Sequence, residues 1–139
     1  MKGWHTLNAK KLLACLLIIL KVLLASCGSP ENNTLKVHFL DVGQADCILI
    51  QAPTGENMLI DAGNNDDADM IVTYLNAKGV KKIDVLVGTH PHEDHIGSLD
   101  TVIDTYDIGK VYMPRVTHTT KTFEDVLIAI KNKGLKIAA

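Results

Sequence analysis

The sequence predicts an α/β fold, a mixed β-sheet covered by helices, that begins at about residue 35. Three observations lead to this prediction. Three short apolar, strand-like segments come first, helix-like and strand-like patterns then alternate, and turn-forming residues separate the segments. A group of strands followed by alternating helices and strands is typical of an α/β layer architecture.

The first predicted strand, residues 35–39, has apolar Leu35, Val37 and Phe39 alternating with polar residues such as His38. A period of two predicts a half-buried strand, with the apolar side chains in the core. His38 is accordingly expected to face solvent.

Residues 47–51 and 58–60 form the next two predicted strands. The turn-forming residues 53–57 between them predict a hairpin. Cys47 begins the first of these strands in an apolar setting, and we interpret it as a small core residue and not as a nucleophile.

The rest of the chain alternates between helix and strand patterns, with glycines placed to end two of the helices. A capping box over residues 122–125 is predicted to start the last helix. The elements expected after the hairpin are a helix ending at Gly79, a buried strand over 83–87, a helix over 99–106, a strand over 111–114, a helix ending at Gly134 and a strand from 135.

The N-terminal residues 1–26 resemble an export signal, with three lysines before the apolar run of residues 12–20. That run is shorter than the roughly 20 apolar residues that span a bilayer. Residues 24–27 resemble the bacterial lipobox, in which the cysteine becomes the lipidated mature N-terminus. We therefore expect an exported lipoprotein, anchored to the cell membrane through Cys27 and facing outside the cytoplasm, with residues 27–34 as a flexible tether. The alternative is a plain secretory signal in which Cys27 is unmodified.

The predicted mature chain is acidic. Removal of residues 1–26 takes away four lysines and no acidic residue, which leaves ten basic against 16 acidic residues. A net negative chain does not favour nucleic acid as a partner through its overall field. Nucleic-acid binding would require lysines such as Lys78, Lys81 and Lys82 to gather on one face.

The motif with the clearest chemistry directly follows the predicted buried strand. His90 and His92 are two residues apart, so they point to the same side of an extended segment, and Pro91 favours that conformation at His90. Asp94 and His95 follow where the chain must turn into a helix. Three imidazoles and a carboxylate suit Zn²⁺ and tolerate Mn or Fe. An exposed histidine-rich loop is the alternative, but four potential ligands at the end of a strand favour a metal site.

The pattern His-x-His-x-Asp-His after a hydrophobic strand resembles the signature of the metallo-β-lactamase superfamily. Residues 61–63, at the end of the hairpin, resemble its first motif. Residues 39–46 are most similar to the branch that contains the hydrolase domain of the DNA-uptake protein ComEC. That branch usually has Gly and Ser where this chain has Ala45 and Cys47.

The resemblance implies an αβ/βα sandwich with a dinuclear zinc-type centre that hydrolyses a small-molecule or phosphodiester substrate. His90 and His92 would bind one metal, and Asp94 and His95 the other. Two ions about 3.5–4 Å apart would share an activated water, which Asp94 would also orient as the catalytic carboxylate. Asp61 would hold a ligand histidine by a hydrogen bond and fix its tautomer.

The family completes its site with a later His, a bridging Asp and a final His, for which this sequence has no motif match. His118 is the only histidine after the motif and is interpreted as an exposed loop residue. We therefore expect residues 35–139 to be a partial domain, the N-terminal half of the sandwich in truncated form. A half-sandwich leaves a sheet face uncovered and is expected to associate. Two alternatives stay open, a non-catalytic metal-binding lipoprotein remnant and an accessory protein of DNA uptake.

Overall fold

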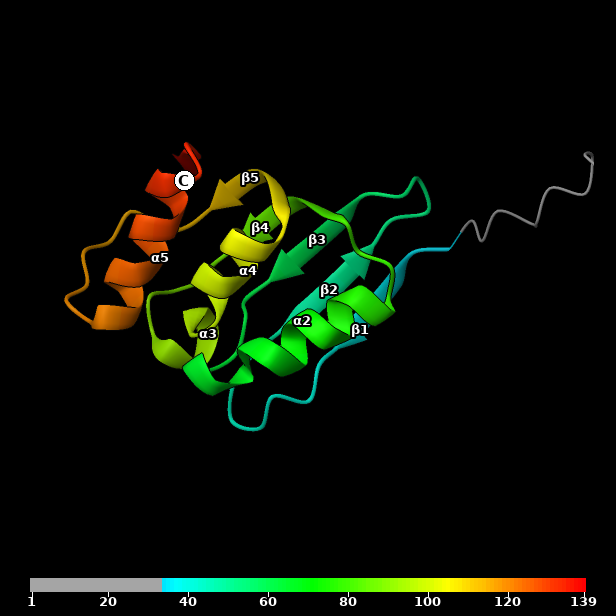
Figure 1. Cartoon of the computed structure of the whole chain (residues 1–139), viewed down its shortest axis with the longest axis horizontal. Coiled ribbons are helices and arrows are strands. Elements are labelled where there is room, and N and C mark those ends of the chain that lie inside the picture. The colour runs from blue at the N-terminus through cyan, green and yellow to red at the C-terminus, as the bar shows by residue number, and fades with distance from the viewer. Residues whose placement is uncertain (1–33) are drawn as a thin grey trace, which may run out of the picture. The chain divides into compact units, whose positions relative to one another are not determined.

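The computed structural model of the chain describes residues 34–139 (Figure 1). The predicted signal peptide, Cys27 and nearly all of the predicted tether lie outside the described residues. Within residues 34–139, the helices are too short or too polar to cross a membrane.

The described residues form one six-stranded mixed sheet with helices, which confirms the predicted α/β class. The first three strands are antiparallel neighbours and the last three follow in parallel. In sheet order the strands are β1 (Lys36–Phe39), β2 (Ile48–Gln51), β3 (Asn57–Ile60), β4 (Lys82–Val87), β5 (Asp107–Tyr112) and β6 (Ile137–Ala138). The helices are the short 3₁₀ turn η1 (Asn65–Asp67), α2 (Ala68–Ala77), α3 (Glu93–Ile96), α4 (Leu99–Thr105) and α5 (Lys121–Asn132).

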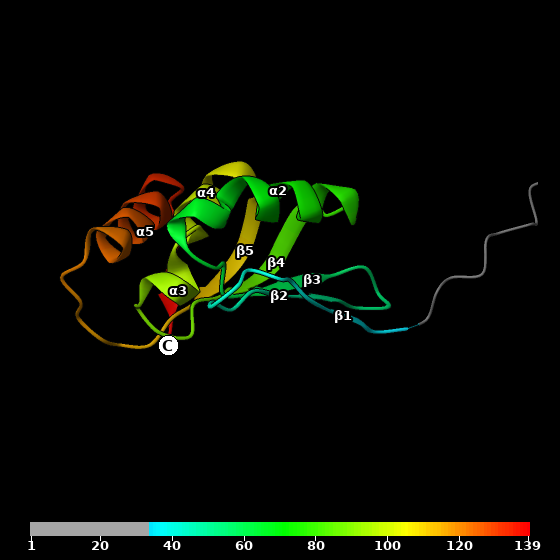
Figure 2. The same cartoon turned by 90° about the horizontal axis from the view of Figure 1, so that it is seen from below.

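The core lies between the sheet and the helices α2, α4 and α5, which cover one side of it (Figure 2). Leucines from β2, β3 and β4 form a row across this side of the sheet, since Leu49 pairs with Leu59 and Leu59 with Leu86. All three are fully buried, and each contributes about 1.5–3 kcal/mol of burial energy. Facing them are the buried helix residues Ile71, Leu75, Val102, Ile103, Val126 and Ile130.

The opposite side of the sheet is apolar and uncovered in the described part of the chain. Its strand register aligns Phe39 with Ile48, Ile48 with Ile60, Ile60 with Val87 and Val87 with Tyr112. Phe39 is 77% exposed. We refer to this uncovered apolar side as the open face.

The orientation predicted for β1 was wrong. Val37 and Phe39 lie on the open face, whereas His38 points toward the helices and its Nδ1 lies 3.1 Å from the hydroxyl of Tyr74 on α2. Alternation shows which residues share a face, but not which face the helices cover. The apolar side of β1 therefore continues the open face instead of entering the core.

The open face is expected to make the protein self-associate. Because Phe39 is its most exposed side chain, Phe39→Lys should shift the form lacking residues 1–27 toward monomer in sedimentation velocity. Ile128→Lys is the matched control, because Ile128 is 45% exposed on α5, outside the sheet. A wild-type protein that is monomeric and unfolds in one sharp transition would contradict this expectation, since it would mean that these residues close a core by themselves.

Strand β5 begins earlier than the predicted 111–114. Asp107 pairs with Lys82 and Tyr112 with Val87, so β5 runs beside the whole of β4. Its first half contains Gly109, a poor strand former that hides the pattern. A Cβ atom at Gly109 would lie 2.5 Å from the Asp84 carbonyl oxygen, so close strand contact requires a glycine there.

Helix α5 starts at a different cap from the one predicted. Thr120 is the N-cap residue, and its hydroxyl accepts a hydrogen bond from the Phe123 amide at 3.4 Å. The capping box predicted at residues 122–125 was therefore wrong. Two threonines two residues apart offer the same side-chain chemistry, and the turn of the preceding loop selects between them.

Candidate metal centre

Two adjacent parallel strands deliver the candidate site to one edge of the sheet. Strand β3 ends at Ile60, which pairs with Val87 at the end of β4. The next residue, Asp61, donates its amide proton to the Val87 carbonyl at 2.8 Å. The histidine motif follows β4, and His92 is the N-cap residue of α3. Strand ends of this kind are where α/β folds place their sites.

Asp61 is the buried support of this edge. Its side chain is almost fully buried, and its φ of +58° lies in the left-handed region, which aspartate tolerates better than most residues. The Thr89 amide donates to Oδ1 at 2.8 Å, and the Thr89 hydroxyl donates to Oδ2 at 2.6 Å. His95 Nδ1 lies 2.9 Å from Oδ2. Three contacts therefore hold one carboxylate under the motif.

The contact with Asp61 determines the tautomer of His95. An ionised carboxylate only accepts hydrogen bonds, so the His95 Nδ1 must carry a proton. The neutral ring then keeps a lone pair on Nε2, and this atom lies 3.5 Å from Oδ2 of Asp94. The free nitrogen of His95 thus faces the other candidate ligands.

Three of the four predicted ligands converge. His90, Asp94 and His95 each offer a ligand atom within 4.8 Å of the others. His92 lies outside this group, although its ring centroid is 5.0 Å from that of His90. Two imidazoles and a carboxylate are the donors that Zn²⁺ prefers, so the residues present fit a zinc ion.

Asp46, which the sequence analysis did not single out, lies near the same nitrogen of His95 as Asp61 does. Its Oδ2 is 3.5 Å from His95 Nδ1, farther than the Asp61 oxygen that this nitrogen bonds. The Asp46 amide donates to the Asp94 carbonyl at 3.0 Å, and the Gly63 amide donates to the Asp46 carbonyl at 2.9 Å. The loop after β1 is thereby tied to the motif. The only sequence signal was its place at the end of residues 39–46, the segment that resembles the ComEC-containing branch.

The backbones of the two motif segments are joined directly. The Ala62 amide donates to the His95 carbonyl at 2.7 Å, and the Gly97 amide donates to the Gly63 carbonyl at 2.8 Å. A Cβ atom at Gly97 would lie 2.2 Å from the carbonyl carbon of Asn64, so no larger residue fits without moving backbone. These backbone contacts fix the position of His95 relative to Asp61.

His118 lies beside the motif, contrary to its interpretation as an exposed loop residue. Its ring centroid is 5.4 Å from that of His92, and the side chain is half-buried. The loop between β5 and α5 carries it there. Nothing in the local sequence indicates this approach, because it depends on how the loop folds back across the end of β4.

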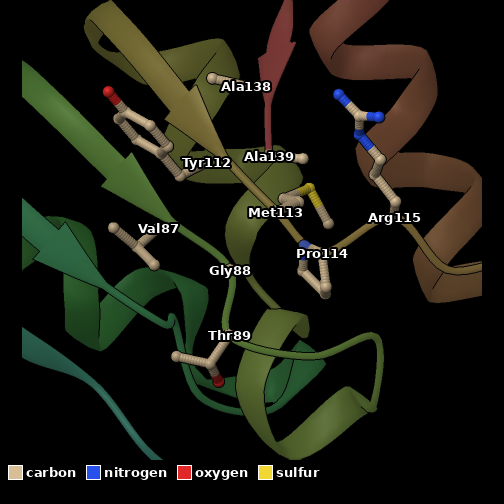
Figure 3. Close-up of a pocket in the computed structure, with 9 residues that line it drawn as sticks. All are labelled: Val87, Gly88, Thr89, Tyr112, Met113, Pro114, Arg115, Ala138 and Ala139. Atoms are coloured by element: carbon tan, nitrogen blue, oxygen red, sulfur yellow. The ribbon is translucent and has the colours of Figure 1, made fainter.

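Two largely apolar pockets lie near the candidate site, one lined in part by Thr89 and the other in part by His118. The first has a volume of about 490 Å³ and opens at the ends of β4 and β5 (Figure 3). Figure 3 shows Val87, Met113 and Pro114 around the backbone of Gly88, one residue before the Thr89 that binds Asp61. The second, of about 470 Å³, is lined in part by His118 and Phe123.

Cys47 is a core residue, as predicted. Its side chain is 2% exposed. Burial, followed by the nearby negative charges of Asp61 and Asp67, raises the pKa of the Cys47 thiol to about 12. The thiol therefore stays protonated at neutral pH and is no nucleophile.

Comparison with known families agrees with this geometry. The family model described as the metallo-beta-lactamase superfamily matches residues 40–137, which include β2 to β5, Asp61 and the whole histidine motif. The chain belongs to the metallo-β-lactamase superfamily. The mixed sheet with helices on one side is consistent with that fold.

Among relatives, the chain is 25% identical over 140 positions to ComE operon protein 3 of Bacillus subtilis, covering 88% of this chain and 18% of that protein. This similarity supports the ComEC-like branch of the superfamily. The chain is also 32% identical over 122 positions to a UPF0173 metal-dependent hydrolase of Thermodesulfovibrio yellowstonii, covering 82% of this chain and 42% of that protein. It is 31% identical over 99 positions to the probable metallo-hydrolase YflN of Bacillus subtilis, covering 65% and 37%. The chain thus spans less than half the length of each of these relatives.

Proposed function

We propose that this chain carries the metal centre of a zinc-dependent hydrolase that acts on phosphodiesters. The observation that supports it is the convergence of His90, Asp94 and His95 above the buried carboxylate of Asp61. Metal-dependent hydrolysis fits the names of two relatives. The choice of a phosphodiester rests on the resemblance of residues 39–46 to the superfamily branch that contains the hydrolase domain of a DNA-uptake protein.

Each residue of this group has a separate task in the proposed reaction. When bound, zinc would supply Lewis-acid chemistry and lower the pKa of a bound water to about 7. His90 and His95 would hold the ion through ring nitrogens. Asp94 would hold it through a carboxylate oxygen and would accept a hydrogen bond from the attacking water. Asp61 keeps His95 in the tautomer that binds metal.

We further propose that the complete centre is dinuclear and needs the second half of the sandwich. Residues 35–139 would then supply the first half of the superfamily domain. The uncovered apolar face and the limited share of each relative that the chain spans support this proposal. His92 would bind zinc beside His90, and the second half would supply the further ligands that the complete centre needs.

The expected result is zinc binding with little or no hydrolysis by this chain. Misplacing a reacting group by about 1 Å can cost a hundredfold in rate, so an incompletely held ion would catalyse poorly. The test is to load the chain and its His92→Ala variant with zinc, measure zinc affinity, and assay both on bis(p-nitrophenyl) phosphate and a chromogenic β-lactam. Equal zinc affinity would contradict a site that includes His92.

The same assay separates the alternatives. Substantial turnover that His92→Ala abolishes would mean that residues 35–139 carry a working catalytic centre by themselves and that the second half is not needed. Zinc binding without turnover, even when a second half of the sandwich is supplied in trans, would favour a non-catalytic metal-binding remnant. An accessory role in DNA uptake would instead require DNA binding, which the acidic charge of the predicted mature chain disfavours.

The proposed site would act outside the cytoplasm. We propose that residues 1–26 are cleaved and Cys27 is lipidated, on the pattern of residues 24–27. Two acyl chains would anchor the protein stably in the membrane. Intact-mass measurement on protein from the native host should give the processed, diacylated mass, whereas a retained Met1 or an unmodified Cys27 would contradict lipidation.

A further inference from the structure

His118 is held against the metal-binding motif by its own loop. Its ring centroid is 5.4 Å from that of His92, with the rings at 62°, in an edge-on contact. On its other side the ring packs on Phe123 of α5 at 6.2 Å and 84°. His118 is thus wedged between the motif and a helix, which restricts its orientation.

A hydrogen bond to the helix cap orients the ring further. Nδ1 of His118 lies 2.9 Å from Oγ1 of Thr120, and this oxygen already accepts the Phe123 amide proton. The Thr120 hydroxyl proton is then free to bond Nδ1. In a neutral imidazole arranged this way, Nε2 carries the proton and is a donor. Within residues 34–139, His118 makes no other hydrogen bond.

A largely apolar cavity is lined in part by His118. Its volume of about 470 Å³ is within the range of small-molecule sites, roughly 300–1,000 Å³. Besides His118, Arg115 and Thr117, its lining is apolar and includes Met113, Val116, Phe123, Leu127 and Ile137. His118 therefore contacts the motif through His92 and also lines a space that suits an organic group.

We propose that His118 is a substrate-contacting residue of this centre. Its Nε2–H donates a hydrogen bond to an anionic oxygen of a phosphate ester held at the motif, and the adjoining cavity takes the organic substituent of that ester. The inference rests on the proposed hydrolase function and narrows its substrates to phosphodiesters in which one ester substituent is apolar or aromatic. We assign His118 to the substrate and not to the metal, because it lies on a separate loop and outside the convergent group of His90, Asp94 and His95.

The test measures three affinities of the full chain in mild detergent at one pH: the affinity for zinc, and the affinities of the zinc-loaded protein for phenyl phosphate and for inorganic phosphate. His118→Ala should leave the zinc affinity within about twofold of the wild type. It should weaken the binding of phenyl phosphate about tenfold, the effect of losing a hydrogen bond to a charged group. His118→Gln, which keeps an N–H donor, should recover most of the loss. Leu127 lies in the cavity wall and is 38% exposed. Leu127→Gln should weaken the binding of phenyl phosphate but not that of inorganic phosphate.

Two results would overturn the inference alone. One is equal phenyl phosphate affinity in the wild type and His118→Ala. The other is a tenfold or greater loss of zinc affinity in His118→Ala, which would make His118 a ligand. A wild-type chain that binds no zinc would overturn the proposed function and this inference together.

Discussion

Replacing Asp61 by asparagine is expected to lower zinc affinity by about 10- to 100-fold, the usual effect of losing the partner that orients a ligand histidine. Asparagine has the same shape but only one acceptor oxygen. That oxygen must face the Thr89 amide, which donates to Oδ1 of Asp61 at 2.8 Å. The amide nitrogen then faces the Thr89 hydroxyl and His95 Nδ1.

The consequence is a change of tautomer. An NH₂ group beside Nδ1 of His95 can only donate to it, so the ring proton moves to Nε2, the nitrogen that faces Asp94. A protonated Nε2 has no lone pair for a metal. Asp61→Ala is expected to act on folding as well, because the Thr89 amide loses its partner at a cost of about 1–3 kcal/mol.

Asp46→Asn is the matched control for Asp61→Asn. Its carboxylate is also near His95 Nδ1, at 3.5 Å, but its side chain is 63% exposed and the proton of Nδ1 goes to Asp61. The zinc dissociation constant of this control should stay within about threefold of the wild type, and its denaturation midpoint should not change. If Asp61→Asn bound zinc as tightly as the wild type, the tautomer argument would be wrong.

The sequence was sufficient for the order of strands and helices but not for the side on which they pack. Leu49, Leu59 and Leu86 stand in apolar segments of the expected lengths, so their burial followed from the pattern. Phe39 was expected in the core and His38 in solvent, and the structure has the reverse. Alternation alone does not tell which face of a strand the helices cover. The sequence pattern did not predict the early start of β5, because Gly109 is a poor strand former. The contact with Asp84 of β4 that requires a glycine there is remote in sequence.

The sequence likewise predicted some residues of the candidate site and missed others. His90, Asp94 and His95 lie within six residues, so their spacing alone predicted that they could share a metal, and the contact of Asp61 with His95 followed from resemblance to a family motif. Asp46 and His118 reach the motif from separate loops. Such approaches depend on tertiary structure, and neither residue stands in a pattern that indicates a ligand.

The largest loss of zinc affinity is expected at the ligands themselves. Asp94→Ala removes the only carboxylate of the convergent group and should cost more than the 10- to 100-fold expected for its support. Glu93 is the matched control, since it is the adjacent acidic residue, begins the same helix α3 and is exposed outside the group. Glu93→Ala also tests whether local negative charge alone attracts the ion.

Zinc titration of the wild type, Asp94→Ala and Glu93→Ala against a chromophoric chelator tests the metal centre most directly. We expect tight binding by the wild type, a loss of at least about a hundredfold in Asp94→Ala, and a change of no more than about twofold in Glu93→Ala. Equal losses in the two variants, or none in Asp94→Ala, would contradict a metal centre built from His90, Asp94 and His95.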